Sequence, residues 1–199
     1  MKKLISLVAF CFATLVMSAQ LPTAIGDFVL GNSMNSVEGI LIAKGFKKVE
    51  IGFLQEATYA KNPSLVMEEG GEMLQASFPV SNPYMYAGEK WQYINLFFYQ
   101  GKLFKIEFKK GYWTEGFEDE ATVKDCQKSK KTLEKNMNSK YAKYQKDKFD
   151  NPYHSLITYS DAKTSISIEY GFGEYEGVSL SYKLFDSAID KKVFPYDYE

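Results

Sequence analysis

Polar and apolar residues alternate strictly near the end of the chain, and this pattern constrains the fold more than any other feature. We expect strands at Ser155–Tyr159, Lys163–Tyr170 and Val178–Leu184. In the last two, one side carries isoleucine, leucine, valine and tyrosine, and the other side carries mainly serine. A strand of this kind packs one face on a core and turns the other to water, as in an antiparallel meander. The pattern therefore predicts an antiparallel sheet.

Two segments with helical spacing come before groups of predicted strands. The first runs from Ser33 to Lys44 and ends at Gly45; the second runs from Glu115 to Tyr144 and carries Cys126 on its apolar stripe. Further strands are expected at Phe46–Ile51, Leu54–Ala60 and Glu72–Val80. This order predicts the α+β class, built as two helix-plus-antiparallel-sheet units with the helices on one sheet face. We place these units at residues 20–112 and 113–192, followed by a flexible tail at 193–199.

A β-hairpin from Trp91 to Lys109 is the clearest local signal. Tyr99-Gln100-Gly101 is typical of a three-residue loop, in which the glycine takes the left-handed conformation of a bulged turn. A loop of that length pairs Leu96 with Phe104 and places both side chains on the core face.

Residues 1–19 have the features of a secretory signal peptide. Lys2 and Lys3 precede the apolar run Leu4–Val16, and Ser18-Ala19 provides a small-residue cleavage site. We expect cleavage near Ala19 and a mature protein that is secreted or periplasmic. The apolar run is shorter than the about 20 residues that a spanning helix needs, so we expect no membrane span. Cys11 lies inside this run, so we expect no lipid anchor.

Composition argues against several classes of function. The chain has no arginine and a formal net charge of −1, so it lacks both the guanidinium fork that reads phosphate and guanine and a basic surface for nucleic acid. His154 is the single histidine, and Cys126 is the single cysteine after residue 19. Every histidine-dependent mechanism must therefore run through His154, which we expect to be a partly exposed turn residue, and a zinc site would need mostly carboxylate ligands. We predict no catalytic residue, no metal and no cofactor.

Short motifs at the two helices resemble a known type of fold. Gly31-Asn32-Ser33-Met34-Asn35-Ser36-Val37 leads into the first helix, Lys44-Gly45-Phe46 follows it, and Lys140-Tyr141 lies late in the second. With the helix–strands–helix–strands order, this resembles the tandem proteins of the β-lactamase inhibitor protein type. The small SmpA/BamE-type envelope lipoproteins look similar over one repeat. The resemblance implies a non-enzymatic binding fold whose sheet presents an aromatic surface to another protein.

Aromatic residues in the hairpin and in two loops are the predicted partner-binding set. They are Tyr84, Tyr86, Trp91, Tyr93, Phe97, Phe172 and Tyr175. Exposed tyrosine and tryptophan are common interface anchors. A second interpretation keeps the hairpin rings in the core, beneath a helix. We expect a binding or adaptor protein of the bacterial envelope with a protein partner. The alternatives are a glycan-binding protein or weak glycoside hydrolase that stacks sugars on the same rings, and a structural envelope component.

Overall fold

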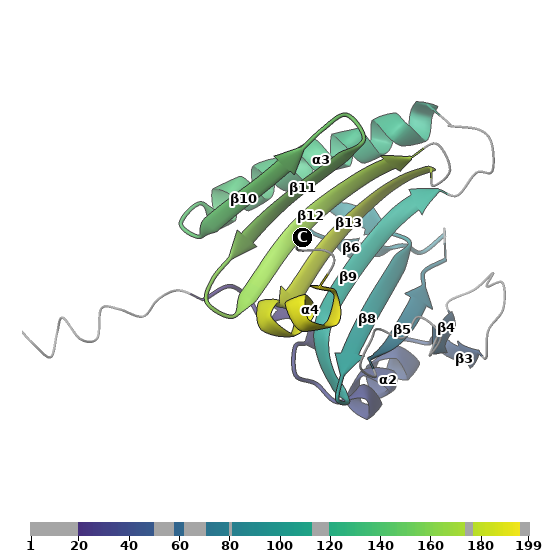
Figure 1. Ribbon diagram of the computed structural model, residues 1–199. Coiled ribbons are helices and arrows are strands. Elements are labelled where there is room, and N and C mark those ends of the chain that lie inside the picture. Colours follow the sequence, from purple (N-terminus) through teal and green to yellow (C-terminus); the bar gives the residue numbers. More distant parts are fainter. Residues whose placement is uncertain are drawn as a thin grey trace, which may run out of the picture.

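The computed structural model describes residues 20–49, 58–61, 71–79, 81–112, 120–173 and 177–195. Its centre is a nine-stranded sheet in the order β10-β11-β12-β13-β9-β8-β5-β4-β3 (Figure 1). Neighbouring strands are antiparallel except β3 and β4, which are parallel. The predicted α+β class with an antiparallel sheet is confirmed.

The elements have the following bounds. The strands of the large sheet are β3 (Lys47–Val49), β4 (Thr58–Lys61), β5 (Glu72–Ser77), β8 (Tyr93–Tyr99), β9 (Lys102–Tyr112), β10 (Gln145–Asp150), β11 (His154–Ser160), β12 (Thr164–Gly173) and β13 (Gly177–Asp186). Two small hairpins pair β1 (Ala24–Ile25) with β2 (Phe28–Val29) and β6 (Tyr84–Tyr86) with β7 (Glu89–Trp91). The helices are α2 (Met34–Ala43), α3 (Glu120–Tyr141) and α4 (Ser187–Val193).

Strands predicted in two separate units lie in one continuous sheet. β9, from the first predicted unit, pairs along its length with β13, from the second. The division of the chain at residue 112 stays a prediction. The predicted signal peptide lies outside the described residues, and no helix in the described part of the chain is both long and apolar enough to cross a membrane.

The two faces of the sheet differ in what covers them. α2, α3 and the β6–β7 hairpin pack on one face over the main core, whereas α4 lies on the other (Figure 1). Ser33 caps α2 by accepting a hydrogen bond from the Ser36 N–H, and Val37 and Leu41 are its buried residues. Cys126 is buried on α3, as its apolar stripe predicts.

The hairpin register differs from the prediction. Gln100 and Gly101 both have positive φ, 50° and 71°, and form a two-residue turn instead of a three-residue loop. A β-bulge then follows in β9, so Leu96 pairs with Ile106. The predicted pairing of Leu96 with Phe104 is therefore wrong. The bulge turns Phe104 to the α4 face, where it is buried against that helix.

The described end of the chain is packed. Val193 ends α4 and is buried, and the ring of Phe194 lies 4.3 Å from the Lys105 Nζ atom. The α4 helix was not expected from the sequence, because it is short and carries few apolar residues.

Candidate functional site

The structure places part of the predicted partner-binding set in the core of the helix face. Trp91 is fully buried, and its indole N–H donates a hydrogen bond to the Tyr86 carbonyl oxygen at 3.0 Å. The rings of Tyr84 and Tyr86 are half-buried, with centroids 5.0 and 5.3 Å from that of Phe108. Trp91 is therefore a core residue, as the second interpretation predicted. Tyr84 and Tyr86 expose only part of their surface to solvent.

The other members of the set lie elsewhere. Tyr93 is on the α4 face and is 37% exposed. Phe97 is half-buried on the same face, with its ring centroid 5.8 Å from that of Phe194. The side chain of Phe172 and the whole of Tyr175 lie outside the described residues. The predicted set is thus divided between opposite faces of the sheet.

A cavity of about 370 Å³ opens between α3 and the β6–β7 hairpin. It is lined by Tyr86, Ala87 and Gly88 of the hairpin, by Leu133, Asn136, Met137, Lys140 and Tyr141 of α3, and by Tyr182 of β13. We call it the tyrosine pocket. It contains one residue of the predicted set, Tyr86.

Local sequence explains how the pocket is built. Leu133, Met137 and Tyr141 are four residues apart, so α3 presents them as one buried row. Opposite them, the hairpin turns at Ala87 and Gly88, which have φ of 54° and 83°. This left-handed pair is the geometry of a tight two-residue hairpin turn, and it brings the hairpin tip to the wall of the pocket.

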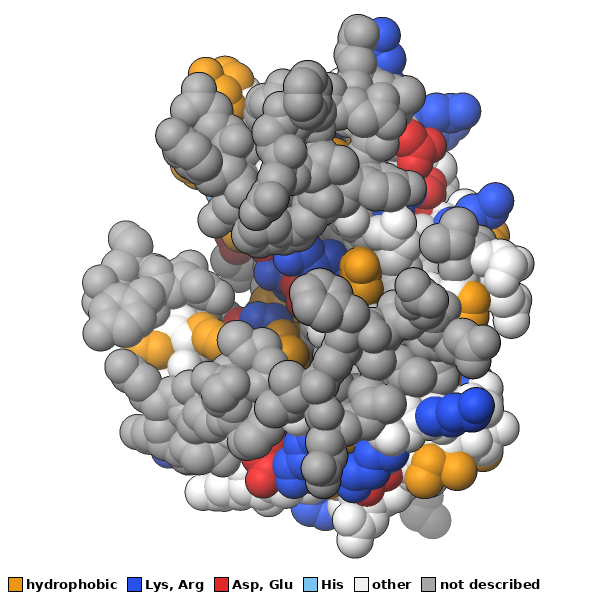
Figure 2. All heavy atoms as spheres, turned by 90° about the vertical axis from the view of Figure 1, so that its right-hand side faces the viewer, with side chains coloured by type: hydrophobic (Ala, Val, Ile, Leu, Met, Phe, Trp, Pro, Cys, Tyr) orange, Lys and Arg blue, Asp and Glu red, His pale blue; other side chains and the backbone are white. Residues whose placement is uncertain are grey.

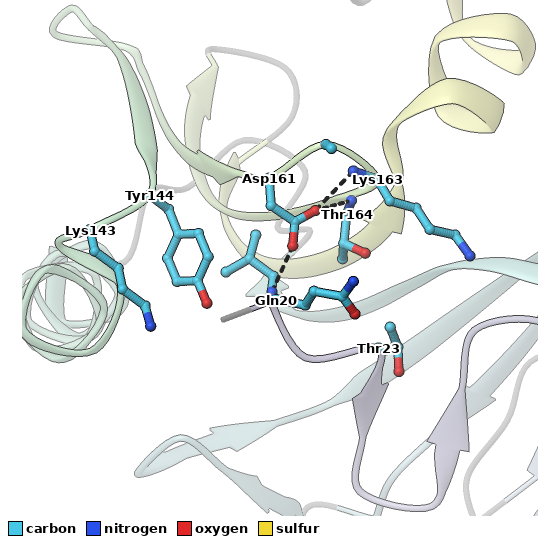
Figure 3. A pocket seen from close by; sticks show the side chains of 9 residues that line it. Gln20, Thr23, Lys143, Tyr144, Asp161, Lys163 and Thr164 are labelled. Atoms are coloured by element: carbon cyan, nitrogen blue, oxygen red, sulfur yellow. Dashed lines mark hydrogen bonds between the residues drawn. The ribbon is translucent and has the colours of Figure 1, made fainter. Parts of the chain in front are cut away.

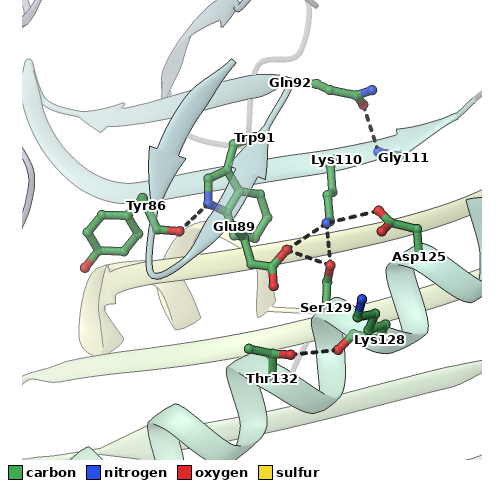
Figure 4. Close-up of polar contacts among 10 residues, drawn as sticks. All are labelled: Tyr86, Glu89, Trp91, Gln92, Lys110, Gly111, Asp125, Lys128, Ser129 and Thr132. Carbon is green, nitrogen blue, oxygen red and sulfur yellow. Dashed lines mark hydrogen bonds and ion pairs between the residues drawn. The ribbon is translucent and has the colours of Figure 1, made fainter. Parts of the chain in front are cut away.

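A buried ion-pair cluster holds the hairpin against α3 beside this pocket (Figure 4). The Lys110 Nζ atom lies 3.0 Å from Glu89 and 3.5 Å from Asp125, and it donates to the Ser129 Oγ atom at 2.6 Å. Ser129 in turn donates to Glu89. Ser129 thus bridges Lys110 of β9 and Glu89 of the hairpin. The cluster has a positioning role.

Three phenol groups meet at the tyrosine pocket. Tyr141 and Tyr182 are 3% and 4% exposed, and the rings of Tyr86 and Tyr182 lie 5.4 Å apart. The Tyr141 hydroxyl has almost no accessible surface, and it lies close enough to the Tyr182 hydroxyl for a hydrogen bond between them to affect the titration of Tyr182.

The surroundings of Tyr86 and Tyr182 suppress the ionisation of these two phenols. Burial raises the pKa of Tyr182, and the neighbouring Tyr86 and Tyr141 raise it further. Burial likewise raises the pKa of Tyr86, against an opposing hydrogen bond with Tyr182. A phenol with a raised pKa is neutral at physiological pH and can donate its proton in a hydrogen bond. Tyr86 and Tyr182 are therefore protonated at the pocket and hydrogen-bond to each other.

The ionisable residues of the lining are three tyrosines and one lysine. They include no carboxylate, imidazole or thiol, and Lys140 is their single charged side chain. Cys126 lies elsewhere in the core, where burial raises its thiol pKa to about 11, so it is not a reactive thiolate at neutral pH.

Comparison with known proteins identifies no relative. No family model, curated protein or solved structure matches this chain. The resemblance to the β-lactamase inhibitor protein type stays a prediction.

The α4 face carries a polar row that was not expected from the sequence. Neighbouring strands contribute Gln75, Asn95, Glu107, Lys183, Glu169 and His154, and each side chain contacts the next in this order. Burial opposes ionisation of Glu169, but Lys183 and His154 outweigh it and lower its pKa to about 2. Lysine and acidic side chains also lie together in a hollow of the surface in Figure 2. Each charged side chain of this row is paired with a neighbour in the row, so the row is a weaker candidate for a ligand site than the tyrosine pocket.

A second cavity, of about 560 Å³, lies beside the start of the described chain (Figure 3). Its one carboxylate, Asp161, accepts hydrogen bonds from the backbone N–H groups of Leu21, Lys163 and Thr164, at 2.6–2.9 Å. Both oxygens of Asp161 are thus used to hold the chain. This cavity is larger than the tyrosine pocket, but its polar centre is already occupied by backbone.

Proposed function

We propose that the protein is an exported, non-enzymatic binding protein of the bacterial envelope that engages a protein partner at the tyrosine pocket. The observation that carries the proposal is a preformed cavity of about 370 Å³ between α3 and the β6–β7 hairpin, with an apolar wall from Leu133 and Met137. Export is supported by the signal-peptide pattern of residues 1–19.

The surroundings of the pocket support a protein as the partner. The cavity, of about 370 Å³, is large enough to admit a side chain of a partner, and hot-spot residues commonly anchor a protein interface by filling such pockets. Met85 lies on the same hairpin with 58% of its surface exposed, and a flexible thioether suits contact with an apolar partner surface.

Site-specific photocrosslinking tests this proposal. A benzoylphenylalanine at position 85 should capture a partner protein when the exported protein is irradiated in cells that produce it. The same probe at Phe149, which is 52% exposed on β10 of the opposite face, should capture none. Capture at position 149 and not at 85 would contradict the site, and capture at neither would contradict a protein-binding function.

A further inference from the structure

We infer that Gln20 is a modification site: once cleavage of the signal peptide makes it the first residue, it cyclises to pyroglutamate, and the fold then protects the bond that joins it to Leu21. This inference rests on the export in the proposed function. It follows from the position of the predicted cleavage site, the anchoring of the next residue and the charge around the new chain end.

The fold begins to hold the chain directly after the predicted cleavage site. Cleavage after Ala19 makes Gln20 the first residue of the mature chain. Gln20 is exposed, whereas Leu21 is only 2% exposed and belongs to the main core. The Leu21 backbone N–H donates a hydrogen bond to Asp161 at 2.6 Å. The peptide bond between Gln20 and Leu21 is therefore fixed on its nitrogen side.

The anchor at Asp161 is charged at neutral pH. Burial opposes ionisation of this carboxyl group, but hydrogen bonds from the backbone N–H groups of Thr164, Lys163 and Leu21 outweigh it and lower its pKa. Asp161 lies in the loop between β11 and β12. The start of the mature chain is thus tied to a loop of the large sheet.

A glutamine at the start of a chain can cyclise without a co-reactant. Its α-amino nitrogen attacks the side-chain carbonyl carbon, Cδ, and the new N–Cδ bond closes a five-membered lactam. The Cδ–Nε2 bond breaks, and the amide nitrogen leaves as ammonia with a proton from the amine, so nothing is oxidised or reduced. The amine must be neutral to attack, and a free α-amino group with a pKa of about 7.7–8.0 is partly neutral at physiological pH.

Charge at the cavity favours the neutral lactam over a charged amine. Gln20 lines this cavity together with Lys143 and Lys163 (Figure 3). Among the described lining residues Asp161 is the one carboxylate, and both of its oxygens already accept backbone hydrogen bonds. An ammonium at the chain end would add a further positive charge, and like charges nearby favour the neutral amine that attacks. The lactam has no charge, and its carbonyl oxygen can accept a hydrogen bond from a lysine.

The mass of the exported protein tests the modification. The chain is produced with residues 1–19 in cells that export it, and the purified product is analysed by intact mass and by its N-terminal peptide. We expect a chain that starts at Gln20, lacks the mass of one ammonia molecule and has no α-amine to label. Gln20→Asn is the matched control: it keeps an amide but could close only a strained four-membered ring, so it should keep its full mass and a free amine.

Pyroglutamyl peptidase tests whether the fold protects the chain end. This enzyme cuts the bond between pyroglutamate and Leu21, whose N–H is held by Asp161. Removal should be at least about tenfold slower from the folded protein than from a synthetic pyroglutamyl peptide of residues 20–26, since cutting the protein requires local opening. Asp161→Ala should lose this protection, whereas Asp147→Ala, at an exposed aspartate of β10, should keep it.

Each outcome supports or overturns the inference. A chain that starts at Gln20 with its full mass, a chain that starts at another residue, or equal rates of removal from protein and peptide would overturn it. Protection that survives in a folded Asp161→Ala variant would overturn the anchor; if that variant does not fold, the comparison of protein with peptide still decides. Retention of residues 1–19 would contradict export itself, so failure of the proposed function can be told apart from failure of the cyclisation alone.

Discussion

Replacing Asp190 with alanine lowers the free energy of unfolding by about 3 kcal/mol. Asp190 on α4 pairs with Lys105 of β9 at 3.0 Å, and the two side chains are only 5% and 7% exposed. Removing the carboxylate leaves the lysine ammonium buried beneath α4, with the Phe194 ring at 4.3 Å in place of a negative charge. An uncompensated buried charge is far costlier than the loss of a surface pair. The measurement is urea-induced unfolding followed by circular dichroism.

Two further variants separate the buried charge from simple loss of contacts. The double variant Lys105→Met with Asp190→Leu removes both charges and keeps apolar volume, so it should recover most of the lost stability. Lys148→Ala removes one partner of the exposed pair with Asp150 and should leave the unfolding midpoint unchanged. If Asp190→Ala unfolds at the same urea concentration as the wild type, the ion pair does not hold α4 on the sheet.

Replacing Trp91 with alanine should cost about 3–5 kcal/mol, the range for truncating a large buried ring. Trp91 is fully buried, with its ring centroid 5.9 Å from that of Phe108 and 6.4 Å from that of Tyr182. The variant also removes the hydrogen bond that fixes the Tyr86 carbonyl, so the wall of the tyrosine pocket should loosen. Chemical unfolding monitored by circular dichroism measures the loss, since the main fluorophore is changed.

The control for this prediction lies on the opposite face. Tyr93→Ala removes an aromatic ring of the same hairpin region that is 37% exposed, and it should cost much less than Trp91→Ala. Similar losses from the two variants would contradict the separation of these rings between a covered and an open face. Acrylamide quenching of Trp91, with Trp113 replaced by phenylalanine, should be weak for the same reason.

The alternation of apolar and polar residues and the helical spacing in the sequence were enough to predict β12, β13 and α3. Ile166, Ile168 and Leu184 alternate with polar residues because one face of β12 and β13 is buried and the other is not. Cys126 and Leu133 follow helical spacing because α3 buries a single stripe. Period and burial are coupled directly in both cases, so sequence predicts them.

Other features depend on contacts that local sequence does not encode. The bulge that turns Phe104 away from the core sets the hairpin register, and nothing in the residues around it specifies its position. The strand β10, from Gln145 to Asp150, was missed because every one of its residues is exposed and most are polar, as is typical of protected sheet edges.

The tyrosine pocket could not be predicted for a similar reason. Tyr86, Tyr141 and Tyr182 are each about 40–55 residues from the next along the chain, and they meet because a hairpin, a helix and a strand pack together. Their individual signals, a loop tyrosine and two rings on apolar stripes, are those of ordinary core residues. Tyr86 was predicted as a binding residue for its loop position, and it is the one member of that set in the pocket.

Nuclear magnetic resonance of the protein labelled with ¹³C in its tyrosine rings tests the central claim most directly. Tyrosine-to-phenylalanine variants assign the resonances, and the partner recovered by photocrosslinking is the titrant. We predict that the resonances of Tyr86, Tyr141 and Tyr182 shift on binding, because a partner side chain enters the cavity that their rings line, whereas Tyr93 on the opposite face does not shift. A shift of Tyr93 with no change in the pocket tyrosines would contradict the account and place the binding surface on the α4 face.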